Sequence, residues 1–428
     1  MTTEPRRVPV FVERLLLLVG APLVFLLFAE AAIAVLGIDT DVARNENAQI
    51  ALPVWLLADE VWVADRQNKL ERSGGEPISA ADVAWLYHFE EARWIGYKMK
   101  PGVDVDAVNP FNAVEVAKNV TFRLASNSSG FRDRPFAAKK PGVTRIVTLG
   151  DSSTFGWGAA PEHTYQRLLE ERLNAIGPGR FEVLNLGIPG HNTRHGLGIL
   201  RHHALQLDPD LLIVAYGAND PRWVPAATDT VLSADDTFMG GLRFTLLKLR
   251  TYRLLRRLVF TLADPLQDEP EADADAATEP TAATSPEERE LVRAVPLEDF
   301  ENNLREFATI GQDVDAGAIF VSVCTSERPY AAAVRNVAAE IGIDALDVRD
   351  VFSAKIDALE AGTLYPEQVD KYRTLYGDLF NQRRAYAVTS DGCHPHWVGH
   401  SLIADELVPL VRSALGHPAI ATEPGELP

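Results

Sequence analysis

From residue 144 onward, short runs rich in apolar and β-branched residues alternate with longer segments of helical periodicity. Runs of this length and composition predict strands, and the segments between them predict helices. The third run, 211–215, is apolar throughout, which is typical of a parallel strand covered on both faces. The expected strands are 145–149, 182–186, 211–215, 318–323 and 345–348, and the expected helices include 164–176, 193–207 and 398–415. The alternation predicts an α/β fold with a doubly wound sheet of five parallel strands.

A second constraint comes from residues 15–38, a run of 24 residues in which Glu30 is the only charged side chain. As a helix this run is about 36 Å long, enough to cross roughly 30 Å of hydrocarbon. Arg6, Arg7 and Arg14 precede it, so the positive-inside rule places residues 1–14 in the cytoplasm. The sequence predicts a single-pass helix in the cell (inner) membrane, with the rest of the chain on the periplasmic or extracytoplasmic side.

The same run also fits a cleaved signal peptide, with 15–28 as its apolar core and Ala29-Glu30-Ala31 as the cleavage site. An acidic residue inside a membrane span costs about 3 kcal/mol, which favours cleavage. However, the apolar run continues to Ile38, which a cleaved peptide would not need. Our prediction is the uncleaved anchor, and both interpretations export the remainder of the chain.

The amino-acid composition is that of a folded protein and argues against one class of partner. The 428 residues are 46% hydrophobic, which is enough for a core, and their net charge of −19 argues against nucleic-acid binding. Residues 264–290 hold ten acidic side chains and one basic one, with few apolar residues, and are predicted to form a disordered surface loop. Residues 242–262 before it have the pattern of a basic amphipathic helix. Such a helix suits either a membrane surface or packing on its own domain, and the sequence leaves both open.

The predicted organisation beyond the anchor has three parts. Residues 39–141 form an exported, smaller α+β region of unknown role, in which the aromatic residues between Trp85 and Tyr97 are expected to pack against the next domain. A ligand surface is the alternative for these aromatics. Residues 142–415 form the sheet domain, interrupted by 242–262 and 264–290, and 416–428 are a C-terminal tail.

Glycines and small polar residues follow the ends of the first three expected strands. They occur in the segments 150–152, 185–190 and 217–220, and a further segment of this kind, 391–395, precedes the last expected helix. In open parallel sheets, ligands bind outside the carboxyl ends of the strands. These segments are therefore expected to meet at one edge of the sheet.

The four segments Gly150-Asp-Ser152, 185–190, Gly217-Ala-Asn-Asp220 and Asp391-Gly-Cys-His394 resemble the motifs of the SGNH, or GDSL-type, esterase and acylhydrolase family. The resemblance covers residues 144 to about 221 and 297 to about 415. It implies the SGNH hydrolase fold, a flavodoxin-like sheet, and a serine esterase of the membrane-anchored bacterial type. Taken alone, each segment also fits a helix cap or a turn. Together, in the family's order and at the expected places, they favour the catalytic site.

The resemblance also assigns roles. Ser152 corresponds to the nucleophile, His394 to the general base that takes its proton, and Asp391 to the carboxylate that orients the imidazole. The imidazole and hydroxyl need no cofactor, and the other histidines show no metal-ligand spacing, so neither a cofactor nor a metal is expected.

The expected oxyanion hole consists of the backbone N–H groups of Ser152 and Gly190 and the side-chain amide of Asn219. Gly190 is chosen over Gly187 because it stands five residues beyond Asn185, where the family's second-block glycine falls.

His396 and Cys393 lie close to the expected base in the sequence. His396 stands where many relatives carry a small polar residue, which makes it a candidate for lining the pocket. Cys393 adjoins His394, and Cys324 ends the fourth expected strand on the same edge of the sheet. We hypothesise that these two cysteines form a disulfide that braces the 391–394 loop, with two unbonded thiols as the alternative.

The expected function is that of a membrane-anchored serine esterase acting through an acyl-enzyme on Ser152. Its substrate would be an ester-bearing small molecule, lipid or glycan, with the O-acyl groups of an envelope glycan favoured. Two alternatives stay open: an O-acyltransferase using the same triad, and a non-enzymatic envelope scaffold or glycan-binding protein. No G-x-S-x-G, P-loop, H-E-x-x-H or G-x-G-x-x-G motif follows a strand, which argues against the corresponding enzyme classes.

Overall fold

The computed structural model describes residues 16–38, 40, 42–45, 50–53, 84–108, 121–176, 180–225, 237–263, 291–324, 327–377, 383–389 and 393–417. The chain divides into two compact units. One, here called the N-terminal unit, comprises residues 1–58 and 234–284. The other, the sheet unit, comprises residues 59–233 and 285–428.

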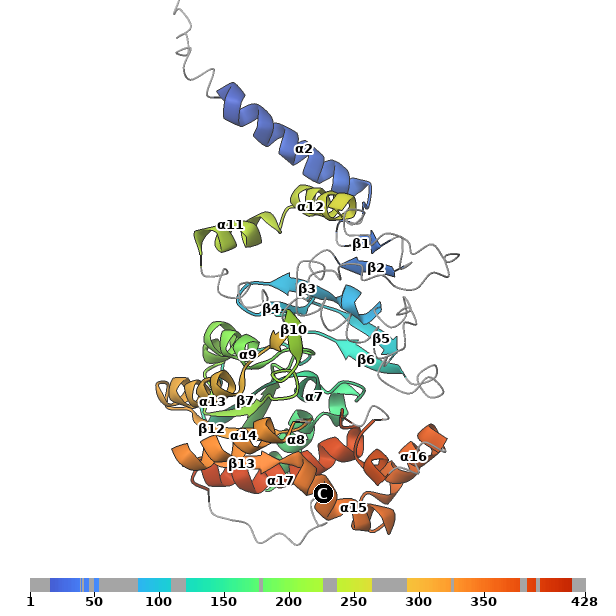
Figure 1. Ribbon diagram of the computed structural model, residues 1–428, viewed down its shortest axis with the longest axis vertical. Coiled ribbons are helices and arrows are strands. Elements are labelled where there is room, and N and C mark those ends of the chain that lie inside the picture. The colour runs from blue at the N-terminus through green and yellow to red at the C-terminus, as the bar shows by residue number, and fades with distance from the viewer. Residues whose placement is uncertain are drawn as a thin grey trace, which may run out of the picture. The chain divides into compact units, whose positions relative to one another are not determined.

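Five parallel strands form the centre of the sheet unit (Figure 1). Their order is β13-β12-β9-β7-β8, so the first strand of the sheet lies between the second and the third. This is the doubly wound, flavodoxin-like arrangement predicted from the sequence, and the prediction is confirmed. The strands are β7 (Val143–Gly150), β8 (Arg180–Asn185), β9 (Leu211–Ala215), β12 (Gly317–Ser322) and β13 (Asp344–Asp347).

Helices cover both faces of the sheet, and the alternating strand residues show which face each side chain joins. Ile146 of β7, Ile213 of β9 and Ile319 of β12 are fully buried in one core with α8, α15 and α17. Leu212 of β9 points to the opposite face, where α13 packs through Gly311. The helices of the sheet unit include α8 (Tyr165–Ile176), α9 (Thr193–Ile199), α13 (Leu297–Gln312), α14 (Arg328–Ile341), α15 (Val348–Glu360), α16 (Pro366–Tyr376) and α17 (Trp397–Ala414).

Two β-hairpins precede the sheet in sequence and belong to the same compact unit. They are β3 (Phe89–Ala92) with β4 (Gly96–Met99), and β5 (Asp104–Val108) with β6 (Thr121–Ala125). A further short antiparallel pair, β10 (Trp223–Pro225) and β11 (Leu291–Arg293), brings together the chain on either side of the long insertion.

The hairpins are joined to the sheet by aromatic packing. The ring centroid of Trp85 lies 5.0 Å from that of Trp157, and the ring centroid of Phe122 lies at the same distance from that of Trp157. Phe89 lies 6.3 Å from Phe155. The structure therefore favours packing over a ligand surface for these aromatics. The hairpin region thus shares a core with the segment that follows β7.

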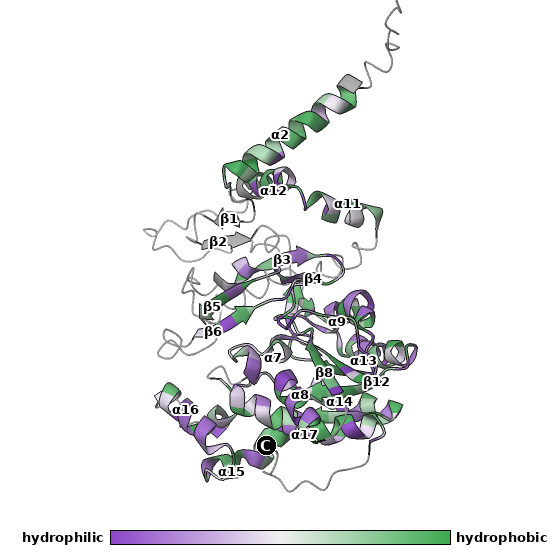
Figure 2. Cartoon of the chain, turned by 180° about the vertical axis from the view of Figure 1, so that it is seen from behind, coloured by the Kyte–Doolittle hydropathy of each residue, from purple (hydrophilic) through white to green (hydrophobic). Residues whose placement is uncertain are grey.

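The N-terminal unit holds the apolar run and the basic segment. The apolar run is helical, as a π-helical turn (Leu16–Gly20) followed by α2 (Ala21–Val35), and β1 (Val42–Asn45) pairs with β2 (Ile50–Pro53). By length and composition, residues Leu18–Val35 could span a membrane, and 6% of them are buried. Figure 2 shows α2 as hydrophobic along most of its length.

The basic segment forms two helices where the sequence predicts one over 242–262. They are α11 (Phe238–Leu246) and α12 (Arg250–Ala263). The separation has a tertiary cause, because the carboxylate of Glu30 in α2 accepts the backbone N–H groups of Arg250 and Thr251 and so begins a new helix there. The predicted acidic loop at 264–290 lies outside the described residues, as do residues 418–428 of the predicted tail.

Candidate active site

The carboxyl ends of β7, β8 and β9 bring three of the predicted segments together. Thr148 in β7 pairs with Asn185 at the end of β8, and Gly150 pairs with Ala215 at the end of β9. The chain segments that continue from these positions contain Ser152, Gly190 and Asn219, which therefore emerge at one edge of the sheet.

Ser152 and His394 are in direct contact there. His394 Nε2 lies 2.7 Å from Ser152 Oγ, although 242 residues separate the two in sequence. The His394 side chain is 7% exposed, and Ser152 is half-buried. With the imidazole proton on Nδ1, Nε2 accepts the serine hydroxyl, which is the geometry that general-base activation requires.

The segment that carries His394 is held by backbone bonds on both sides. Thr389 N–H donates to the carbonyl of His394 at 2.8 Å, and His396 N–H donates to the carbonyl of Ala387 at 3.2 Å. Asp391, the predicted carboxylate of the triad, lies outside the described residues, so its role stays a prediction.

Ser152 opens a four-residue helix, α7 (Ser152–Phe155), directly after β7. Asp151 caps this helix, because its carboxylate accepts the backbone N–H of Ser153 at 2.9 Å. Gly150 has to be a glycine, since a Cβ there would lie 2.7 Å from the carbonyl oxygen of Ala215 and would overlap the side chain of Thr154. The tight junction between β7 and α7 at Gly150 fixes the direction of the Ser152 side chain.

Gly190 lies in a tight turn over residues 188–191. His191 N–H donates to the carbonyl of Ile188 at 3.3 Å, Pro189 occupies the second position, and Gly190 has a φ of +81°. This is the pattern of a type II turn, in which the third position requires the left-handed region that glycine adopts without strain. By contrast, the N–H of Gly187 is bonded to Asn185 Oδ1 at 2.9 Å, which supports the choice of Gly190 as an oxyanion donor.

Asn219 is bonded to the same turn. Its side-chain amide donates to the carbonyl of His191 at 2.8 Å, and the residue is 4% exposed. The amide carries two N–H groups, and this bond uses one. Asn219 is thus oriented by the turn that holds Gly190, so the two predicted oxyanion donors are fixed relative to each other.

Asp220, next in sequence, connects the loop that follows β9 to the start of α9. Its carboxylate accepts the backbone N–H and the hydroxyl of Thr193 at the start of α9, and the backbone N–H of Gly217 at 3.1 Å. The side chain is completely buried, and burial raises its pKa to about 6.

This shift predicts a pH-dependent stability. Because the folded state holds the Asp220 proton more tightly than the unfolded state, the free energy of unfolding should fall as pH rises from about 4 to about 6. A shift of about two pKa units corresponds to on the order of 3 kcal/mol. Urea unfolding of wild type and Asp220→Asn between pH 4 and 7 measures the effect, and the stability difference between the two proteins should decline over that interval. A difference independent of pH would contradict it.

Two residues of the hairpin region support the site, and the sequence did not single out either for this role. The hydroxyl of Tyr97 donates to the carbonyl of Pro189 at 2.7 Å, within the turn of Gly190. Arg132 donates to the carbonyls of Phe155 and Gly156 at 2.9 and 3.0 Å, at the end of the helix that Ser152 opens. Burial lowers the pKa of Arg132 to about 9, which leaves it charged at neutral pH.

The other histidines near the site are held neutral by burial. Desolvation lowers the pKa of His195 and of His396 to about 4, and it lowers the pKa of His191 well below its usual value. His396 also fills a structural position, since its Nδ1 accepts the backbone N–H of Val398 and its ring stacks on Tyr372 at 3.8 Å. His396 therefore caps α17 as a buried residue, which differs from the pocket-lining position considered from the sequence.

Cys324 and Cys393 are joined by a disulfide, with their Cα atoms 5.2 Å apart. Cys324 follows β12, and Cys393 directly precedes His394. The bond therefore connects the catalytic-edge end of the sheet to the segment that carries the proposed base, as hypothesised from the sequence.

Removing the disulfide should destabilise the fold. The bond closes a loop of 69 residues, and cross-links of this kind typically contribute about 2–4 kcal/mol by restricting the unfolded chain. The double variant Cys324→Ser/Cys393→Ser should lose stability of that order in urea unfolding. Reduction with dithiothreitol should lower the stability of wild type to the level of the variant and leave the variant unchanged. Equal stability of oxidised wild type and variant would contradict this.

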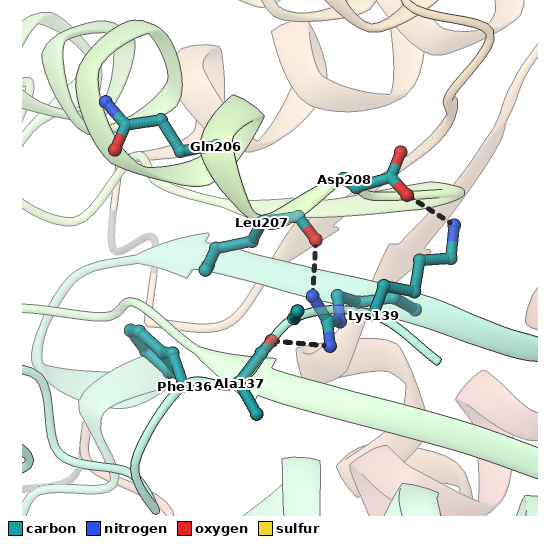
Figure 3. Close-up of a pocket in the computed structure, with 8 residues that line it drawn as sticks. Phe136, Ala137, Lys139, Gln206, Leu207 and Asp208 are labelled. Carbon is teal, nitrogen blue, oxygen red and sulfur yellow. Dashed lines mark hydrogen bonds and ion pairs between the residues drawn. The ribbon is translucent and has the colours of Figure 1, made fainter. Parts of the chain in front are cut away.

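A hollow of about 420 Å³ lies at the opposite edge of the sheet (Figure 3). It is lined by Arg145 near the start of β7 and by Leu207 and Asp208, which precede β9. Arg145 is already bonded to the carbonyl of Leu207 and to Glu182, and Lys139 is paired with Asp210 at 2.7 Å. Because its cations are engaged within the protein, we assign this hollow no part in the chemistry at Ser152.

Residues 148–313 match the model of the GDSL-like lipase/acylhydrolase family. No curated protein matches the sequence.

Among solved structures, a two-domain esterase active on acetylated mannans shares 16% identity and a TM-score of 0.36, over 65% of this chain and 53% of that one. A lipase/acylhydrolase from Enterococcus faecalis shares 17% identity and a TM-score of 0.33, over 63% and 96%. An acetylxylan esterase from Geobacillus stearothermophilus shares 15% identity and a TM-score of 0.34, over 67% and 100%. Over residues 148–313, the sheet unit is similar to the GDSL-like lipase/acylhydrolase family.

Proposed function

We propose that this protein is a membrane-anchored serine esterase that acts through an acyl-enzyme on Ser152. The observation that carries the proposal is the 2.7 Å contact between His394 Nε2 and Ser152 Oγ. A hydroxyl becomes an effective nucleophile when an adjacent base takes its proton, and an imidazole at this distance is such a base. The turn that contains Gly190 and the oriented amide of Asn219, in segments that leave the same edge of the sheet, support the same conclusion.

In the proposed reaction, Ser152 Oγ bonds to the ester carbonyl carbon while its proton passes to His394 Nε2. The negative charge that develops on the carbonyl oxygen is stabilised by the N–H groups of Ser152 and Gly190 and by the amide of Asn219. The carbon–oxygen bond to the alcohol then breaks, and His394 returns the proton to the departing oxygen. Water then bonds to the acyl carbon while His394 takes its proton. The bond to Ser152 Oγ breaks, His394 returns the proton to that oxygen, and the acid is released. Asp391 is proposed to hold the imidazole in the required tautomer.

The proposed substrates are O-acyl groups of an envelope glycan. What supports this class is the apolar run at residues 15–38, since an anchored enzyme stays beside the glycans and lipids of the envelope. An O-acyltransferase with the same residues would pass the acyl group to an acceptor alcohol, whereas an esterase passes it to water.

One assay separates these functions. The full chain in detergent is given p-nitrophenyl acetate with and without added oligosaccharide, and nitrophenol, acetate and acetylated sugar are measured together. Equal amounts of nitrophenol and acetate support the esterase, whereas acetylated sugar in place of acetate would identify a transferase. The absence of any turnover would contradict both and favour a binding protein.

The proposed anchor needs a separate test. Membranes from an expressing bacterium are washed with alkaline carbonate, and the intact mass of the retained protein is measured. Retention with residues 1–31 present supports a single-pass anchor with the sheet unit outside the inner membrane. Release into the carbonate fraction, or a mass that begins after Ala31, would show a cleaved signal peptide.

A further inference from the structure

Helices α11 and α12 carry a row of exposed apolar side chains that we call the interfacial face. On α12 it consists of Leu255, Leu258, Val259 and Leu262, of which Leu255 is 60% and Leu262 is 74% exposed. Residues spaced in this way, at i, i+3, i+4 and i+7, lie on one side of a helix. Phe238, Met239 and Leu242 extend the interfacial face onto α11, where Phe238 is 84% exposed.

The charge of the two helices is of a single sign. The segment 237–263 contains six basic residues and no acidic one. On α12, Arg253 and Arg257 are about 160° or more around the helix from Leu255, and Arg256 lies at the side, as follows from 100° per residue. The helix thus has an apolar face and a basic face. This is the pattern of helices that lie in the plane of a membrane surface, with the apolar side among acyl chains and the basic side among phosphates.

A contact within the N-terminal unit ties this pair of helices to the apolar run. Glu30 of α2 accepts the backbone N–H of Arg250 at 2.7 Å and the backbone N–H of Thr251 at 2.9 Å, and it also bonds the hydroxyl of Thr251. These are backbone donors of the first turn of α12, which lack partners within their own helix. Glu30 therefore caps α12 from another helix, and α12 packs against α2 beside it.

The contact between Glu30 and α12 also indicates how deep the start of α12 lies in the bilayer. Glu30 lies eight residues before Ile38, the end of the apolar run, which is about 12 Å along a helix axis. The run is about 36 Å long and the hydrocarbon core about 30 Å thick, so about 6 Å of the run at this end can extend beyond the core. Glu30 and the start of α12 then lie about 6 Å below the interface, the depth of an interfacial helix. An acidic group at that depth is costly without partners, and the three hydrogen bonds from α12 supply them.

We propose that α11 and α12 form a lipid-binding surface that lies in the interface of the same bilayer that α2 crosses, with anionic headgroups as its ligands. The inference rests on the proposed anchor and adds a second membrane attachment, on the side where the chain leaves the membrane. Two observations select lipid as the occupant: continuity with α2 through Glu30, and a positive charge without any acidic residue in segment 237–263, where Lys248 and Arg250 are exposed.

The test uses the full chain in vesicles of phosphatidylcholine and phosphatidylglycerol at 7:3. Leu258→Cys is labelled with an NBD fluorophore without reducing agent, so that the native disulfide is kept, and Gln312→Cys on exposed α13 is the matched control. Quenching by doxyl-labelled lipid should be at least threefold stronger at position 258 than at 312, with a blue-shifted emission. Leu262→Cys, one turn along the same face, gives an independent reporter if Leu258→Cys does not fold. Quenching at 258 and 262 equal to that at 312 would overturn the proposal.

Two further comparisons separate the parts of the inference. In vesicles of phosphatidylcholine alone, quenching at position 258 should fall at least twofold, and unchanged quenching would overturn the role of anionic headgroups. In Glu30→Ala it should also fall at least twofold, and unchanged quenching would overturn the role of the cap.

The anchor is scored independently by carbonate extraction of the same vesicles. Protein retained after carbonate but not quenched at position 258 refutes the surface helices and leaves the anchor standing. Protein released by carbonate refutes the anchor. A blue-shifted emission at 258 without quenching by doxyl-labelled lipid would indicate a second copy of this chain as the occupant and would overturn the lipid proposal.

Discussion

Ser152→Ala should lower kcat/KM for p-nitrophenyl acetate by about 10⁴–10⁶-fold, the loss typical when the nucleophile of a serine–histidine pair is removed. The structure gives the reason, since His394 Nε2 lies 2.7 Å from the hydroxyl that this change deletes. The fold should be retained, because the backbone N–H of Ser153 still donates to the carboxylate of Asp151, which caps α7. Initial rates at several substrate concentrations, with unfolding curves for both proteins, measure the effect.

Ser153→Ala is the matched control for this experiment. It removes the adjacent hydroxyl and keeps the same backbone and the same helix cap. Its kcat/KM should stay within about threefold of wild type, a change of less than about 1 kcal/mol in activation free energy, because the reacting groups stay in place. A loss of less than tenfold in Ser152→Ala, or an equal loss in both variants, would remove Ser152 from its proposed role.

Asn219→Ala should lower kcat by about 10²–10³-fold with a much smaller change in KM, since an oxyanion donor acts mainly in the transition state. Asn219 is 4% exposed and its amide is oriented by the carbonyl of His191 at 2.8 Å. The donor is therefore held in place before substrate arrives. Steady-state kinetics with p-nitrophenyl acetate separate kcat from KM.

Asn303→Ala provides the comparison for Asn219. Its amide bonds the hydroxyl of Thr193 at 2.8 Å, within the same hydrogen-bonded network but one step farther from the turn of Gly190. We expect kcat to fall by less than about fivefold in this variant, since one hydrogen bond typically contributes about 1 kcal/mol. If Asn219→Ala behaved like Asn303→Ala, the oxyanion assignment of Asn219 would be wrong.

The sheet could be predicted from the sequence because its signals are local. A parallel strand covered on both faces needs an apolar run of about five residues, and 211–215 has one that the structure shows as β9 (Leu211–Ala215). Strand ends at one edge also predict which distant residues meet. Cys324 and Cys393 are paired by their places at this edge. The resemblance to the SGNH family, in contrast, is what pairs Ser152 with His394.

The supports of the site could not be predicted in the same way. Tyr97 and Arg132 act through bonds to main-chain carbonyls, and a carbonyl acceptor leaves no mark in the sequence of its residue. The cap of α12 by Glu30 joins residues 220 positions apart. From the sequence, Glu30 is an isolated charge in an apolar run, and the break between α11 and α12 falls in a pattern that is helical throughout.

The central claim is that Ser152 is an activated nucleophile, and covalent labelling tests it most directly. The full chain is treated with a fluorophosphonate, digested, and the modified residue is identified by mass spectrometry, with Ser152→Ala and His394→Ala alongside. The account predicts one adduct, on Ser152, that is absent in Ser152→Ala and formed at least 100-fold more slowly in His394→Ala. An unlabelled wild type, or an adduct that persists in Ser152→Ala, would contradict it.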